Sequence, residues 1–82
     1  MDKRTAQLIL AMLEETHTTI ATNHHAALQE GEALGTQFPE LNHILLPVAV
    51  AQDAEVKRTL AELETRIAAA KLAIEIFEIF EE

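Results

Sequence analysis

The 82-residue sequence contains no cysteine, serine, tryptophan or tyrosine. Without cysteine there is no disulfide framework, thiolate metal site or thiol nucleophile. The threonines of Thr16–Thr22 have no evident oriented base or oxyanion donors, so nucleophilic catalysis has no support. The missing aromatic residues weaken the case for a ring-stacking site for sugars or bases. We therefore expect a protein that is not an enzyme, and the absence of cysteine is compatible with the reducing cytoplasm.

Basic residues are scarce. Six Lys and Arg residues stand against fourteen Asp and Glu residues, which gives a formal net charge of −8. Direct binding to a phosphate backbone needs clustered Lys and Arg, so we expect no direct contact with nucleic acid. The excess of acid either keeps the chain soluble or attracts a basic partner. One alternative function is therefore an acidic inhibitor or antitoxin that covers a basic nucleic-acid-binding surface.

Long apolar runs are also missing. None reaches the roughly 18 apolar residues that suggest a membrane span, and the run Leu8–Leu13 is too short for a signal-peptide core. We expect one cytoplasmic domain, residues 1–82, with neither cofactor nor small-molecule ligand. A chain of this size buries only about 60–65% of its unfolded surface, so its own core is marginal. A protein partner, a homodimer, or both are expected.

Glycine occurs only at Gly31 and Gly35, so few positions favour the end of a long helix. Steps of three and four residues define a first helical seam: Ala6, Ile9, Leu13, Thr16, Ile20, Asn23 and Ala27. The pattern predicts a helix over about residues 3–31, with Asp2 as its N-cap and a glycine as its C-cap. The two polar seam residues, Thr16 and Asn23, are interpreted as devices that fix register.

Proline occurs twice. After a turn over about residues 32–38, Pro39 suits the first turn of a second helix over about residues 39–81, and Pro47 is expected to kink it. The predicted fold is all-α: an antiparallel helical hairpin with a long, Pro-kinked second helix, completed into a four-helix bundle by dimerisation. A three-helix bundle is the alternative.

The second helix carries the strongest pattern in the chain. Its seam is Val56, Leu60, Leu63, Ile67, Ala70, Ile74 and Phe77, and beyond Ile67 almost all of its circumference is apolar. If the first helix ends near Gly31, the part of the second helix from Ala68 onward extends about 20 Å beyond the start of the first helix. The predicted partner-binding residues are Ile67, Leu72, Ile74, Ile76, Phe77, Ile79 and Phe80. The leading function is a protein-interaction module, such as an adaptor, co-chaperone or subunit stabiliser.

Four acids crowd the end of this helix: Glu75, Glu78, Glu81 and Glu82. They lie at the negative pole of the helix dipole, where acids are mildly unfavourable. Solubility of a very apolar segment explains them, and a basic surface on a partner is the alternative.

One motif has metal-ligand spacing. Glu14 and His17 form Glu-x-x-His, which places a carboxylate and an imidazole on one helix face in di-iron bundles. A metal-binding helical bundle that uses this pair is the second alternative function. His17 and His24 lie about 10 Å apart along a helix, too far for one ion, and His24 and His25 are expected to be exposed.

Overall fold

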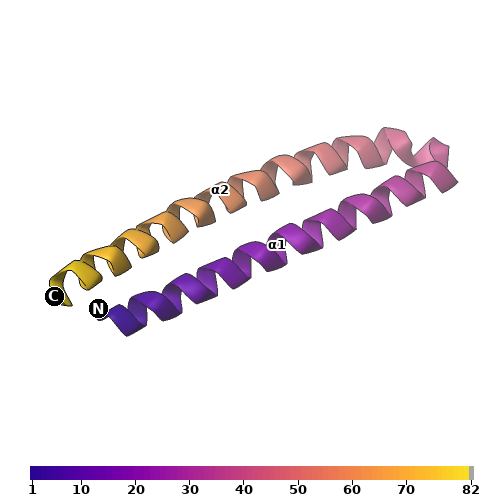
Figure 1. Ribbon diagram of the computed structural model, residues 1–82. Coiled ribbons are helices and arrows are strands. Elements are labelled where there is room, and N and C mark those ends of the chain that lie inside the picture. The colour runs from indigo at the N-terminus through magenta and orange to yellow at the C-terminus, as the bar shows by residue number, and fades with distance from the viewer. Residues whose placement is uncertain (82) are drawn as a thin grey trace.

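The computed structural model describes residues 1–81 and is all-α (Figure 1). Its elements are α1 (Lys3–Gln37), the short 3-10 helix η1 (Pro39–Leu41) and α2 (Asn42–Glu81). The two long helices run antiparallel, with both chain ends at one end of the molecule and the connection at the other. The molecule measures 64 × 15 × 14 Å. The antiparallel hairpin is confirmed, and within residues 1–81 the alternative of a three-helix bundle is wrong.

Helix α1 begins where the sequence predicts. The carboxylate of Asp2 accepts a hydrogen bond from the backbone N–H of Thr5 at 2.8 Å, and this bond holds the pKa of Asp2 below its ordinary value. A capping side chain of this kind satisfies one of the backbone donors that the first turn of a helix leaves free.

The predicted end of α1 near residue 31 is wrong, because the helix continues through both glycines to Gln37. Neither glycine has a positive φ, so neither forms a left-handed cap. Gly35 is buried against Asn42 at the start of α2, where a Cβ atom would overlap the Asn42 side-chain oxygen. The Asn42 side-chain amide donates a hydrogen bond to the Gly35 carbonyl at 3.4 Å. Gly35 therefore allows the close approach of two helix ends.

The connection is short and hydrogen-bonded. The Phe38 N–H donates to the Leu34 carbonyl at 2.8 Å, and the Leu41 N–H donates to the Phe38 carbonyl at 2.9 Å. Pro39 occupies the first turn of η1, where its missing N–H costs nothing. Helix α2 continues through Pro47 without a break and is gently curved along its length (Figure 1).

The predicted overhang of α2 is wrong. Lys3 Nζ in the first turn of α1 lies 3.1 Å from Glu81 Oε2 in the last turn of α2, so the two helix ends are level. Residues 32–37 are helical and extend α1 by about 9 Å toward the turn, and α2 begins at Asn42, later than the predicted residue 39. Together these two differences remove most of the predicted overhang.

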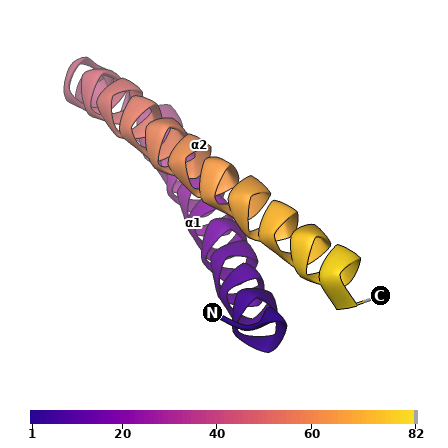
Figure 2. The same cartoon turned by 90° about the vertical axis from the view of Figure 1, so that its left-hand side faces the viewer.

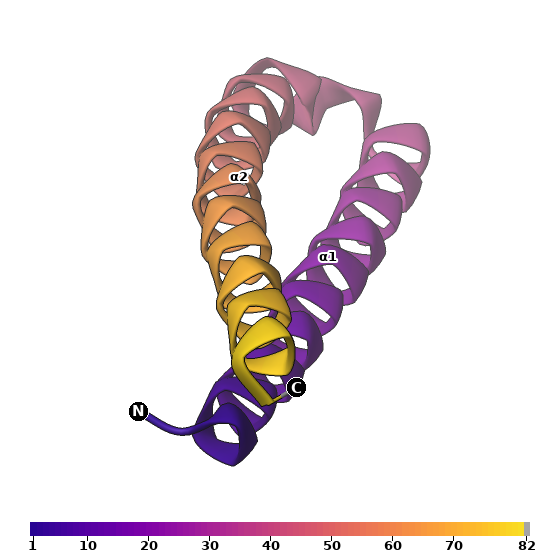
Figure 3. The same cartoon turned by 60° about the vertical axis from the view of Figure 1, so that its left-hand side comes forward.

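The two helices cross at an angle along a shared seam (Figures 2 and 3). All seven predicted seam residues of α2 are buried or half-buried, which confirms that pattern. On α1 the prediction holds for four of the seven residues, Ala6, Ile9, Leu13 and Ile20. Thr16, Asn23 and Ala27 are exposed, and the neighbouring His17, His24 and Leu28 are half-buried instead. The Thr16 hydroxyl donates to the Met12 carbonyl at 2.8 Å, so its own helix satisfies it.

The core of this hairpin is small. Among the described residues, Ala6 and Leu63 are the only buried hydrophobic residues, although 49% of the sequence is hydrophobic. The accessible surface is 6344 Å², whereas a compact monomer of 9.1 kDa exposes about 4,900 Å². The hairpin therefore leaves exposed much apolar surface that a compact domain would bury.

Candidate docking surface

The large exposed hydrophobic side chains of residues 1–81 gather at the two ends of the hairpin. Beside the chain ends they are Met1, Leu8, Met12, Leu72, Ile76, Ile79 and Phe80; beside the turn they are Leu34, Phe38, Leu41, Ile44, Leu46, Val48 and Val50. The middle of the hairpin contributes none of them. Clustered exposed apolar side chains are typical of interaction sites, whereas scattered ones are ordinary.

A groove of about 360 Å³ runs between α1 and α2 beside the chain ends. Its sides are Ala6, Ile9 and Leu13 from α1 and Ala69, Ala70 and Ala73 from α2, with Met1 and Arg66 completing the lining. Four of these residues are alanines, whose small side chains let another helix approach closely. The groove can therefore receive large apolar side chains.

Large exposed side chains continue the apolar surface from this groove around the outside of both helices. On α1, Met12 follows Ile9 by three residues and Leu8 precedes Met12 by four. On α2, Ile76 follows Ala73 by three residues, and Leu72 and Phe80 lie four residues to either side of Ile76. Residues three and four apart are neighbours on a helix surface. We call the groove together with Leu8, Met12, Leu72, Ile76 and Phe80 the terminal surface.

Charged side chains of the two helix ends lie on the other flank of the seam. Lys3 lies three residues before the buried Ala6, and Ile9 lies three residues after it. These two positions lie on opposite sides of Ala6 around the helix, so Lys3 is on the flank away from the groove residue Ile9. Around the half-buried Phe77, residues Ala73 and Phe80 lie on the groove side and residues 78 and 81 on the opposite side. The terminal surface is therefore separate from Glu78 and Glu81, whereas the exposed Glu75 lies three residues from Leu72 at its edge.

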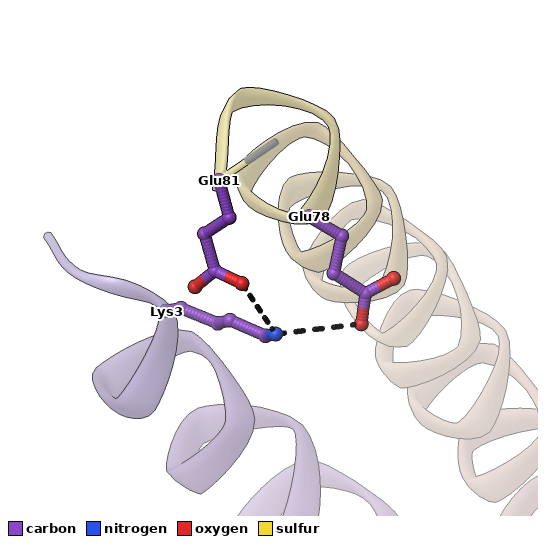
Figure 4. A network of polar contacts seen from close by, with 3 residues as sticks. All are labelled: Lys3, Glu78 and Glu81. Atoms are coloured by element: carbon purple, nitrogen blue, oxygen red, sulfur yellow. Dashed lines mark hydrogen bonds and ion pairs between the residues drawn. The ribbon is translucent and has the colours of Figure 1, made fainter.

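Two of those acids bind a base of the same chain (Figure 4). Lys3 Nζ lies 3.1 Å from Glu81 Oε2 and 3.8 Å from Glu78 Oε1. Glu75 is exposed, and Glu82 lies outside the described residues. The ion pair gives Glu78 and Glu81 a role in joining the helix ends.

The structure divides the predicted partner-binding residues into two groups. Ile67, Ile74 and Phe77 are half-buried on the seam with α1, while Leu72, Ile76, Ile79 and Phe80 are exposed. Sequence reasoning missed Leu8 and Met12, whose exposed fractions are 58% and 68%. Their spacing of four residues, away from the seam, was the available signal.

The expected exposure of His24 is wrong, because His17 and His24 both pair with carboxylates of α2. His17 Nε2 lies 3.1 Å from Glu64 Oε1, and His24 Nε2 lies 2.8 Å from Asp53 Oδ1. Asp53 also forms an ion pair with Lys57 at 2.7 Å. The pKa of Asp53 is lowered, first by the hydrogen bond from His24 and then by that from Lys57.

These contacts leave little support for a metal site. The imidazole of His17 contacts Glu64 on the other helix, while Glu14 is exposed. Residues 1–81 contain no group of three or more His, Cys, Asp or Glu side chains that could hold a metal ion. The chain on its own thus does not assemble a metal centre around Glu14 and His17 in the part that the structure describes.

A second hollow of about 550 Å³ lies beside the turn. Small residues, Ala27, Gly31, Gly35 and Ala49, contribute to its lining, together with polar groups that include Glu32. Figure 3 shows the helices separated next to the turn. This hollow is more polar than the groove of the terminal surface.

Neither α1 nor α2, within residues 1–81, has an apolar stretch long enough to cross a membrane. Comparison of the chain with protein-family models, with curated proteins and with solved structures gave no match.

Proposed function

We propose that this protein is a helical protein-interaction module that binds a partner through the terminal surface. The observation that supports the proposal is the exposure of large apolar side chains from both helices around one groove. An adaptor, a co-chaperone and a subunit stabiliser are the roles that such a module serves.

Five large apolar side chains of the terminal surface would leave water on binding: Leu8, Met12, Leu72, Ile76 and Phe80. Burying a large apolar side chain contributes roughly 1.5–3 kcal/mol, so covering all five amounts to on the order of 10 kcal/mol. That is comparable to the whole stability of a small domain, about 5–15 kcal/mol. Covering the terminal surface is therefore a large driving force for association.

A helical partner suits this surface better than an extended peptide. The groove lies between two antiparallel helices and exposes no strand edge in residues 1–81 to which a peptide could add. Two further helices packed along it would complete a four-helix bundle. Such a bundle is formed by two copies of the chain or by one copy and another helical protein.

The test compares the wild-type chain with Ile76→Lys, which places a charge on the terminal surface, and with Val50→Lys beside the turn. Each is purified from its native cell at high salt, which screens contacts between exposed charges. We expect the wild type and Val50→Lys to retain a stoichiometric companion, either a second copy or another protein, and Ile76→Lys to lose it. A wild-type chain that retains no companion of either kind contradicts the proposal.

A further inference from the structure

We infer that the terminal surface is covered by the same surface of a second copy of the chain. This inference rests on the proposed function and names the partner. Three features of the chain support it: its exposed area, the shape of the terminal surface and the charge of that surface.

The exposed area fits a homodimer. The chain exposes about 1,400 Å² more than a compact monomer of its mass. Two copies that each bury this excess would bury about 2,800 Å² in total, which lies in the range of about 2,000–5,000 Å² for obligate homodimers. The hairpin as a whole therefore exposes enough surface in excess of a compact monomer for a dimer interface.

The shape of the terminal surface is self-complementary. Its floor is lined by small residues such as Ala69 and Ala73, and its borders carry large ones such as Met12 and Ile76. In a two-fold symmetric contact the same surface is used twice, so the borders of one copy fill the groove of the other. One chain thus supplies both the ridges and the groove that helix packing requires.

The charge of the surface permits self-association despite the net charge of −8. Arg66 is the one charged residue in the groove lining. The ion-paired Lys3, Glu78 and Glu81 lie on the opposite flank of the seam. The groove itself carries little charge, so two copies can meet along it without opposing Glu78 and Glu81.

The experiment measures the mass of the wild type by light scattering over a wide range of chain concentration. We expect twice the chain mass of 9.1 kDa. Met12→Lys and Ile76→Lys should each raise the dimer dissociation constant on the order of 100-fold, because each buries a charge without a partner. The matched control is Val50→Lys, because Val50 is 69% exposed and Met12 68% exposed in the hairpin. It should leave the dissociation constant unchanged.

A second measurement needs no variant. The unfolding temperature of a wild-type dimer falls on dilution, whereas that of a monomer does not change. The inference is overturned if the wild type stays monomeric at millimolar concentration. It is also overturned if the wild type is a dimer that Val50→Lys disrupts and that Met12→Lys and Ile76→Lys leave intact. If a monomeric wild type retains a different protein through Ile76, the inference fails and the proposed function stands. If it retains none, both fail.

Discussion

His24 on α1 donates a hydrogen bond from Nε2 to Asp53 Oδ1 on α2 at 2.8 Å, across a sequence separation of 29 residues. The His24 side chain is only 14% exposed, which makes this the less exposed of the two histidine–carboxylate pairs. The pair joins the helices in the half of the hairpin nearer the turn and fixes which residues of the two helices face each other there.

Replacing Asp53 with Asn should lower the free energy of unfolding at neutral pH. The pKa of Asp53 in the folded chain lies below its ordinary value of 3.8. The stability that Asp53 contributes is therefore present above pH 3.8 and is lost as the pH falls through the lowered pKa. Denaturant unfolding at fixed chain concentration should therefore show a difference between wild type and Asp53→Asn near neutrality that shrinks in acid. Glu64→Gln, at the more exposed pair with His17, should have the smaller effect. A difference that persists unchanged in acid contradicts this account.

The two glycines of α1 should respond differently to alanine. The Cβ atom added by Gly31→Ala has no neighbour within 4 Å. This substitution should raise the free energy of unfolding by about 0.5–1 kcal/mol, because a helix interior prefers alanine to glycine. The Cβ atom of Gly35→Ala would displace the Asn42 side-chain oxygen and disturb the hydrogen bond from Asn42 to the Gly35 carbonyl, so its gain should be smaller. Denaturant unfolding of both variants tests this. In an Asn42→Ala background the two glycine substitutions should change the free energy of unfolding by similar amounts. If Gly35→Ala is already as stable as Gly31→Ala in the wild-type background, the close contact with Asn42 is contradicted.

Pro47→Ala should stabilise the hairpin by about 1–3 kcal/mol. Pro47 lies inside a continuous helix, where it lacks an N–H donor and crowds the carbonyl of residue 43. Thermal unfolding and helix content by circular dichroism are the measurements. A loss of stability on this substitution would mean that the curvature of α2 depends on the proline.

Removal of the Asp2 cap should lower the free energy of unfolding. Asp2→Ala removes the acceptor for the Thr5 N–H, whereas Asp2→Asn keeps an oxygen in that place and should cost much less. Hydrogen exchange of the first-turn amides of α1 locates the effect. Equal losses for both variants would show that the charge of Asp2 matters and its hydrogen bond does not.

The sequence predicted the hairpin and the whole seam of α2, because Val56 to Phe77 repeat at steps of three and four without a polar interruption. It did not predict the end of α1. A glycine that caps a helix and a glycine that permits a close approach look the same in a sequence, and the contact that distinguishes them at Gly35 comes from Asn42. The wrong overhang followed in part from this error and in part from the later start of α2 at Asn42.

The candidate site was predicted for one helix only. Ile76 and Phe80 stand out in a long apolar segment, whereas Leu8 and Met12 become part of a surface only when the ends of α1 and α2 are level. The histidines were misplaced because Thr16 and His17, like Asn23 and His24, are adjacent and differ by only about 100° around the helix. Their carboxylate partners on α2 decide which of the two faces inward.

The antiparallel hairpin also orders the steps of its own folding. The polar contacts between the helices close loops of increasing length from the turn outward, with separations of 29 residues for His24–Asp53, 47 for His17–Glu64 and 78 for Lys3–Glu81. Loop-closure entropy favours the shorter separations first, and each contact shortens the loop that the next must close. On this entropic ground we expect the terminal surface to be assembled last, so the proposed self-association would follow hairpin closure.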